Sequence, residues 1–559
     1  MDRSSRPRSG ATRRELVATG AGLLALGAAG ALTTPAHARL LATGKVRGLG
    51  RGRFADGVAS GEPGPSAVTF WGRLRTDRPR SAARLVVATD EGLRDVVATT
   101  LVPTSSAVDH TLKARVGGLQ PSRHYWYAWQ SADDVSPVGR TKTAPPADSR
   151  QAVAVGFSSC QSYPHGFFNA HADAAAQDLD LYVQLGDYTY EYAFGDYGDL
   201  RGKGGVDFAS VDLRTYRDKL RLYRADAALR ELHRLHPVIH TWDDHEVADN
   251  YTDGQPSPSA QQRNAGYRAS FEWMPRIAVP GDRFRLFRGL RLGRTVELLM
   301  LDERQYRDVA VVGRSILGRR QMEWLKGRLA TTDASWKLLG NPDLFAPLGL
   351  NPTGEGLVDP INFDGWGGYP HERTEVLQHL VASRIDDVAL LTGDVHMFMA
   401  NDLMIGGRSV ATEYMGGSVT SPGLDVLEGT TASVVRGINP HIRFLDGLHH
   451  GWAVARASDQ RLEIEFRASD SVVSGAPSRT LARFRQDRGE NRVTQVAGAT
   501  RASDRAFRED PARAPVAPGT PLAARAARID RAATRDLERR ARGGAAERAL
   551  RADRARSGR

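Results

Sequence analysis

The sequence predicts a layered α/β domain, with β-sheets flanked by helices, that follows a small all-β sandwich. Two patterns support this prediction. Residues 45–145 contain short β-branched or aromatic runs separated by Pro, Gly and Asp, which is typical of a sandwich. Residues 151–500 contain apolar runs of strand length that alternate with helical segments. These runs end in polar, Gly or Asp residues, as buried strands do when their carboxyl ends deliver functional side chains.

The first 38 residues predict a cleaved export signal that is not part of the fold. Three early arginines and the pair Arg13-Arg14 precede a weakly apolar stretch, residues 16–32, and Ala36-His37-Ala38 fits a cleavage site. A membrane anchor is the alternative, but four glycines interrupt the stretch, which is short for the roughly 20 apolar residues of a span. Paired arginines favour export of a folded chain by the twin-arginine translocase, to an extracellular, periplasmic or cell-wall location.

Several runs predict the strands of the sandwich and then a linker. The stretch "GLQPSRHYWYAW" resembles the Leu-x-Pro-x-x-x-Tyr-x-Tyr turn into a strand of fibronectin-type domains. Residues 141–150, "TKTAPPADSR", then predict an interdomain linker because of their prolines and polar residues. The predicted sandwich strands are "SAVTFWGRL", "AARLVVATD" and "RHYWYAWQS".

The second domain is predicted to be built on buried strands. Each run is apolar and is followed by turn residues or by acids, which favours a strand covered on both faces. The predicted strands are residues 153–157, "LDLYVQLGD", "PVIHTWDDHE", "TVELLMLDER", "SWKLLGN" and "VALLTGDVH".

The formal net charge of +11 lies at the two ends of the chain. Residues 1–38 hold five arginines against two acids and residues 501–559 hold sixteen against eight, so residues 39–500 are net neutral. A neutral body lacks a phosphate-backbone footprint, so we expect no specific nucleic-acid binding by it. The basic Ala/Arg-rich tail has almost no large apolar side chains, which predicts a disordered extension with at most a weak contact to surface polyanions.

Side chains with metal-ligand chemistry follow four of the predicted strands. A thiol, a phenol, an imidazole and several carboxylates together suit a site that holds an oxidised iron beside a harder cation. These residues are Cys160, the only cysteine; Asp187 and Tyr190; Asp243, Asp244, His245, Glu246 and Asn250; and Asp394 and His396.

Each of these residues also has a purely structural interpretation. A single buried cysteine is usually a small hydrophobic residue. An Asp after Gly at a strand end is commonly a turn residue or a helix cap, and acids at a helix start interact with the helix dipole. Four such strand ends in one order are hard to obtain by chance, so together they favour a metal site.

The order Cys, Gly-Asp-x-x-Tyr, Asp-Asp-His-Glu and Gly-Asp-x-His resembles the calcineurin-like metallophosphoesterases. Within that superfamily it is similar to the PhoD-like alkaline phosphatase/phosphodiesterase family (alkaline phosphatase D). The similarity extends over about residues 50–470. The stretches that carry it are "FADGVASGEP", "SSCQ", "LGDYTYEY", "TWDDHEVADNY", "MLDERQYR", "DGWGGYPHER", "LLTGDVH", "EYMGGSVTSPG" and "NPHIRFLD".

The resemblance implies an enzyme that hydrolyses phosphate mono- and diesters with iron(III) and calcium. It implies that Asp187 bridges the two ions and that His245 faces the leaving group. Thiolate and phenolate donate strongly to iron(III), and the metal itself would deprotonate the thiol. The implied iron ligands are Cys160, Asp187, Tyr190 and His396.

The resemblance places Asp244 and Asp394 on the calcium side, and Asn341 is a further calcium-side candidate. Asp244 takes the place of an asparagine and Asp394 that of a histidine, so ligation becomes oxygen-only, which favours calcium over zinc or manganese. Spacing alone leaves open whether Asp243 or Asn250 takes the role of Asp244.

Other residues near these motifs have weaker support, and substrate-binding residues stay unknown. Glu303 stands where the family usually has a small polar residue, and "GGYP" from Gly367 lacks an acid that the family often has. A structural role is favoured for the remaining phosphate-contact candidates, which are Arg304, His165, His449 and His450.

Two alternatives to an exported phosphohydrolase remain at this point. One is a phospholipase-like or nucleotide-directed metalloesterase of the same fold. The other is a non-catalytic protein that binds surface polyanions. The sequence contains no P-loop, dinucleotide fingerprint or Ser-His-Asp elbow, which argues against those classes of enzyme.

Overall fold

The computed structural model describes residues 40, 47–194, 196, 200–201, 208–252, 257–308, 314–348, 363–423 and 430–498. The predicted export signal, residues 1–38, and the predicted tail, residues 501–559, lie outside the described residues. Among the helices of the described part, none is long and apolar enough to cross a membrane.

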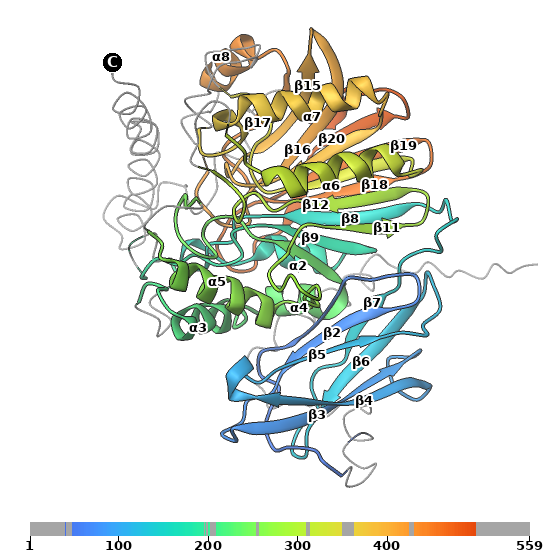
Figure 1. The fold of residues 1–559 in the computed structure, drawn as a ribbon, viewed down its shortest axis with the longest axis vertical. Helices are drawn as coiled ribbons and strands as arrows, with labels where there is room; N and C mark the ends of the chain where they lie inside the picture. Colours follow the sequence, from blue (N-terminus) through green and yellow to red (C-terminus); the bar gives the residue numbers. More distant parts are fainter. Residues whose placement is uncertain are drawn as a thin grey trace, which may run out of the picture. The chain divides into compact units, whose positions relative to one another are not determined.

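The N-terminal strands form two antiparallel sheets (Figure 1). The apolar faces of the sheets pack on each other, with Trp129 fully buried and the rings of Phe70 and Tyr127 edge to face at 4.8 Å. The three-stranded sheet contains β1 (Val58–Gly61), β2 (Val68–Arg73) and β5 (Thr111–Val116). The four-stranded sheet contains, in order, β4 (Val96–Ser105), β3 (Arg80–Ala88), β6 (His124–Gln130) and β7 (Gly139–Lys142), and η1 (Ser106–Val108) follows β4.

The first seven-stranded sheet of the second domain has the order β10-β9-β8-β18-β19-β20-β21. Its strands β8, β9 and β10 are parallel, so their carboxyl ends lie at one edge, whereas β18 joins β8 antiparallel. The strands are β8 (Val153–Ser158), β9 (Leu181–Leu185), β10 (Val238–Thr241), β18 (His450–Ala457), β19 (Arg461–Ser469), β20 (Ser478–Asp487) and β21 (Thr494–Gly498).

The second seven-stranded sheet has the order β11-β12-β13-β14-β16-β15-β17. Strands β12, β13, β14 and β16 are parallel to one another, and β11, β15 and β17 are paired antiparallel at the two sides. The strands are β11 (Arg288–Leu292), β12 (Val296–Met300), β13 (Trp336–Asn341), β14 (Val388–Thr392), β15 (Phe398–Ile405), β16 (Arg408–Gly416) and β17 (Ile442–Asp446).

The two seven-stranded sheets pack face to face and helices cover their outer faces. The core between the sheets contains side chains from both, including Phe157, Leu298 and Trp336. Helices α2 (Asn169–Ala175), α3 (Leu213–Tyr223), α4 (Ala227–Leu235) and α5 (Ala260–Trp273) pack on the first sheet. Helices α6 (Gly318–Thr331), α7 (Pro370–Ala382) and α8 (Thr430–Ile438) pack on the second (Figure 1).

The predicted fold class is confirmed, and each apolar run named above contains a strand. The predicted alternation of strands and helices ends after β14, however. From Phe398 to Gly498, strands β15 to β21 are accompanied by the single described helix α8. Tight turns explain the difference: Gly406 and Gly407 have φ of 55° and 75°, which glycine adopts readily, and they connect β15 to β16 as a hairpin.

The sandwich and the second domain share an apolar contact. Trp71 of β2 packs in the same cluster as the helices of the first sheet, and its indole N–H donates to the carbonyl oxygen of Glu272 at 2.9 Å. The indole N–H of Trp273 donates to Asp109 Oδ2 at 3.1 Å, and Lys113 donates to the carbonyl oxygen of Arg276 at 3.2 Å. Buried indoles with satisfied N–H groups make this a specific contact.

Candidate metal centre

The predicted site residues lie at the carboxyl ends of parallel strands in both large sheets. Cys160 and Asp187 follow β8 and β9, and Asp243 follows β10, each two residues after the strand ends. Asn341 is the last residue of β13, and Asp394 lies two residues after β14. The sequence pattern of an apolar run followed by a polar residue therefore brings five separate chain segments to one region.

Two glycines allow these strand ends to approach closely. A Cβ at Gly186 would lie 2.5 Å from Asp243 Cβ, and Gly186 has a φ of 100°. A Cβ at Gly393 would lie 2.7 Å from Ser159 Cβ, across the gap between the two sheets. The Gly in each Gly-Asp motif is thus needed for packing at the site, and any other residue would push the strand ends apart.

The backbone is strained at the predicted ligands. Cys160, Asp187, Asp394 and His396 have φ of 58°, 54°, 72° and 58°, a left-handed conformation that residues other than glycine rarely adopt. Such strain costs on the order of 1–3 kcal/mol per residue and is found mainly at functional sites. Its coincidence with four predicted ligands supports a functional role for this cluster.

Cys160, Asp187 and His396 form the first group, with ligand atoms that all lie within 4.8 Å of one another. The hydroxyl oxygen of Tyr190 lies 2.8 Å from Asp187 Oδ2 and 3.4 Å from His396 Nε2. His396 Nδ1 lies 2.8 Å from the carbonyl oxygen of Pro422, so an N–H at Nδ1 places the lone pair of the ring on Nε2, the atom that would bind a metal. The structure therefore brings together the four side chains predicted to hold iron.

Asp187, Asp244 and His245 form a second group that shares Asp187 with the first. Nδ1 of His245 lies 2.9 Å from Glu191 Oε2, and its Nε2 lies 3.9 Å from Asp244 Oδ2. Burial alone would lower the pKa of His245, but the carboxylates of Asp244, Glu191 and Asp187 raise it well above its usual value. These carboxylates thus favour the protonated form of His245, and its Nε2 lies on the side of Asp244.

Asp243, Asp343 and Asp394 form a third group within the same limit of 4.8 Å. Arg304 lies beside it, with Nε 2.5 Å from Asp243 Oδ1 and Nη2 3.0 Å from Asp343 Oδ1. The same guanidinium contacts Asp364 Oδ2 at 2.8 Å. Asp394 therefore lies with Asp243 and Asp343, while Asp244 lies with Asp187.

Glu246 holds the backbone of two of these loops. Its Oε1 accepts from the N–H of Tyr188 at 2.7 Å, and its Oε2 accepts from the N–H groups of Asp187 and Asp243 at 3.2 and 3.0 Å. One buried carboxylate thereby fixes the loops after β9 and β10 relative to each other. The carboxylate of Asp244 is oriented by Asn250, whose backbone N–H donates to Asp244 Oδ2 at 2.6 Å.

Asn341 lies at the rim of the third group and is engaged in hydrogen bonds. Its Oδ1 accepts from Trp366 Nε1 at 3.2 Å, and its Nδ2 donates to the carbonyl oxygen of Asp343. Trp366 Nε1 also donates to Glu303 Oε1 at 3.0 Å, and Glu303 Oε2 accepts from the N–H of Asp343 at 2.8 Å. Glu303 therefore orients the Asp343 loop.

The buried acids and the thiol fit a bound cation. Burial raises the pKa of Asp187 to about 8, and burial followed by the charge of Asp187 raises the pKa of Cys160 well above its usual value. Asp187 Oδ1 and Asp243 Oδ2 are buried without a hydrogen-bond partner among the described residues. A cation would satisfy these oxygens and keep the acids and the thiol deprotonated.

The sequence did not single out Asp343, Asp364 or Glu191. Asp343 and Asp364 stand in stretches that look like turns, "NPDLF" and "DGWGG", and their place at the site depends on contacts with residues far away in sequence, including Arg304. Glu191 follows Tyr190 directly, so its position in "GDYTYEY" was the available signal. Arg304 has the structural ion pairs that the sequence favoured for it.

Comparison with known proteins gives consistent matches. A family model described as "PhoD-like phosphatase" matches residues 154–466, and one described as "PhoD-like phosphatase, N-terminal domain" matches residues 41–145. Alkaline phosphatase D from Bacillus subtilis (strain 168) is 30% identical over 490 residues, which cover 80% of this chain and 83% of that protein.

A solved structure described as "Structure of PhoD" is 29% identical and has a TM-score of 0.74. The match covers 80% of this chain and 93% of that one, so it includes both described domains. The resemblance inferred from the strand-end motifs is thereby confirmed. The chain belongs to the PhoD-like phosphatase family and is a phosphoric ester hydrolase.

Proposed function

We propose that this protein is an exported phosphohydrolase that uses iron(III) and calcium to hydrolyse phosphate mono- and diesters. The observation that carries the proposal is the donor set around Asp187: a thiol, a phenol and an imidazole on one side, and only carboxylates and His245 on the other. Strongly donating anionic ligands such as thiolate and phenolate suit iron(III), whereas oxygen-only ligation suits calcium. The predicted twin-arginine signal supports export after a metal has been bound.

In this proposal Cys160, Asp187, Tyr190 and His396 hold iron, and Asp187, Asp244 and Asp394 hold calcium, with Asn341 at the rim of the calcium side. Two cations at this site would supply positive charge to the phosphoryl oxygens and lower the pKa of a water nucleophile. The protein fixes the geometry through strained loops and through Glu246, so little reorganisation is needed during reaction.

His245 is proposed to donate a proton to the leaving oxygen. Its imidazolium form is stabilised by nearby carboxylates, and Glu191 binds Nδ1 so that Nε2 carries the transferable proton into the site. The ring lies 4.3 Å from the ring of Tyr190, which limits its rotation. Glu191 is therefore a positioning residue for His245.

Glu191→Gln is expected to lower kcat by about 100-fold and to leave KM near the wild-type value, because Glu191 acts through His245 and not on the substrate. Steady-state kinetics with p-nitrophenyl phosphate would measure both values. Metal content should not change. Glu231→Gln is the matched control, since Glu231 pairs with Arg234 in α4. A wild-type kcat in Glu191→Gln would contradict the role of Glu191.

Metal analysis combined with a substrate panel tests the proposed function directly. Protein purified after folding in the cytoplasm is expected to contain iron and calcium, to be coloured by charge transfer from thiolate or phenolate, and to release p-nitrophenol from both p-nitrophenyl phosphate and bis-(p-nitrophenyl) phosphate. A calcium chelator should stop both reactions. Protein that contains zinc alone, or that hydrolyses neither ester when fully loaded, would refute the proposal.

A further inference from the structure

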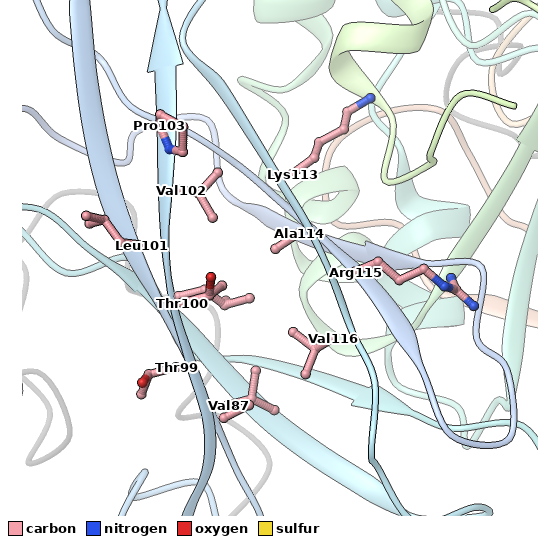
Figure 2. Close-up of a pocket in the computed structure, with 12 residues that line it drawn as sticks. Val87, Thr99, Thr100, Leu101, Val102, Pro103, Lys113, Ala114, Arg115 and Val116 are labelled. Atoms are coloured by element: carbon pink, nitrogen blue, oxygen red, sulfur yellow. The ribbon is translucent and has the colours of Figure 1, made fainter. Parts of the chain in front are cut away.

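The sandwich carries an open edge that its own strands do not cover. Among the described strands, β4 pairs with β3 alone, and β5, at the edge of the other sheet, pairs with β2 alone. A groove of about 460 Å³ lies between β4 and β5. Figure 2 shows Thr100 and Val102 projecting toward this groove from one wall and Val116 from the other, while Thr99 and Leu101 project to the opposite side of β4.

No charged residue protects the β4 edge from pairing with another strand, and Pro103 interrupts the edge only near one end. From Val96 to Val108 there is no charged residue, although a quarter of the chain is charged. Of the ten large apolar side chains that are exposed in the described residues, four lie in this segment: Val96, Val97, Leu101 and Val108. Charges on edge strands normally prevent association, so their absence here points to a surface that is covered in use.

The groove walls offer no charge to select a charged ligand. Lys113 and Arg115 line the groove only with their stems, and Figure 2 shows both side chains directed away from it. Arg115 donates to the carbonyl oxygen of Glu62 and to the hydroxyl of Thr69, and Lys113 donates to the carbonyl oxygen of Arg276. The occupant of this edge is therefore uncharged where it touches β4.

We propose that β4 pairs with β4 of a second copy of this chain, antiparallel and about a two-fold axis at Thr99. Antiparallel edge pairing about a two-fold axis places side chains of the same sheet face opposite each other. With the axis at Thr99, Val97 lies opposite Leu101 of the partner subunit, which covers two of the exposed apolar side chains, 51% and 47% exposed in one chain.

The same register avoids every unfavourable opposition along the strand. Ala98 lies opposite Thr100 of the partner subunit, and no two like charges face each other because the segment has none. Pro103 has no N–H and ends the pairing, so about seven residues take part, a length of roughly 23 Å. The resulting interface between the two copies, which lies beside the open groove, is small. Interfaces of this size are typical of weak complexes, in which the fraction of dimer depends on protein concentration.

The first test measures association of the full chain by sedimentation velocity from about 1 to 200 μM. The wild type is expected to shift reversibly from monomer to dimer over this range, and the double variant Val97→Lys with Leu101→Lys is expected to stay monomeric. Val381→Lys is the matched control, because Val381 is an equally exposed side chain on α7. All variants should retain wild-type phosphatase activity.

The second test fixes the register with an introduced cysteine. Cys160 is buried and is the only cysteine, so Thr99→Cys supplies a single accessible thiol. Opposite residues of an antiparallel pair have Cα atoms about 4.5–5.5 Å apart, within the range that a disulfide spans. Treatment with diamide, a thiol oxidant, is therefore expected to cross-link Thr99→Cys chains into covalent dimers.

Leu101→Cys is the matched control for the register. The two introduced cysteines would lie about 13 Å apart along the strands, so diamide should not link them. A wild type that stays monomeric at 200 μM, a dimer that survives in the double lysine variant, or equal cross-linking of Thr99→Cys and Leu101→Cys would each overturn the proposal. None of these measurements depends on the metals.

Discussion

Replacing Cys160 by alanine is expected to remove iron from the protein and to lower phosphatase activity by at least about 100-fold. Cys160 is fully buried, has a φ of 58°, and its Sγ lies with Asp187 and His396 in one group of ligand atoms. Loss of an outer partner of a metal ligand already costs about 10- to 100-fold, and loss of the ligand itself costs more. Iron content, visible absorption and turnover of bis-(p-nitrophenyl) phosphate would measure the effect.

A structural role for Cys160 makes the opposite prediction. If the thiol were only a small core side chain, alanine would cost about 1 kcal/mol of folding free energy and leave iron and activity unchanged. Ser159→Ala is the matched control, because Ser159 Oγ lies 3.0 Å from Cys160 Sγ but Ser159 is not one of the proposed metal ligands. Iron retained in Cys160→Ala at the level of Ser159→Ala would remove Cys160 from the site.

The strand ends at the site could be predicted because their signal is local. A buried strand is a short apolar run, and the turn after it needs Gly and Asp, so Asp187 and Asp394 stand out in the sequence. The structure adds the reason why glycine precedes them: Gly186 and Gly393 let neighbouring strand ends approach within contact distance. Position and backbone conformation are thus encoded within a few residues.

Residues that reach the site through long-range contacts could not be predicted in this way. Asp343 and Asp364 acquire their roles from Arg304, which lies 39 and 60 residues away in sequence. The order of the strands is equally non-local, because β8 pairs with β18, about 300 residues later. A single sequence carries no signal for such pairings beyond the apolar character of each strand.

The position of strand β4 at an uncovered sheet edge could not be predicted from the sequence either. No strand was predicted over Val96–Ser105, and edge strands and central strands look alike in sequence when one face is buried. Only the sheet order reveals that Val97 and Leu101 lie on an uncovered edge. The proposed dimer therefore depends on the structure, whereas the proposed metal ligands were already apparent in the sequence.

Replacing Arg304 by methionine is expected to lower the free energy of unfolding by about 3–5 kcal/mol. The Arg304 side chain is fully buried and pairs with Asp243, Asp343 and Asp364 at 2.5, 3.0 and 2.8 Å. Methionine has a similar volume but no charge. Asp343 and Asp364 would keep their ion pairs with the buried Arg307, whereas the fully buried Asp243 would lose its arginine partner where solvation cannot replace it. Urea unfolding at matched metal content would measure the loss.

Arg320→Met is the matched control for this prediction. Arg320 forms an ion pair with Asp282 at 2.8 Å, but its side chain is 68% exposed, so removal of the pair should cost no more than about 1 kcal/mol. Adding Asp243→Asn to Arg304→Met should restore part of the loss, because the carboxylate that lost its arginine partner is then neutral. Equal unfolding midpoints for the Arg304 and Arg320 variants would show that the buried acids do not depend on Arg304, and Arg307 and bound cations would then have to balance them.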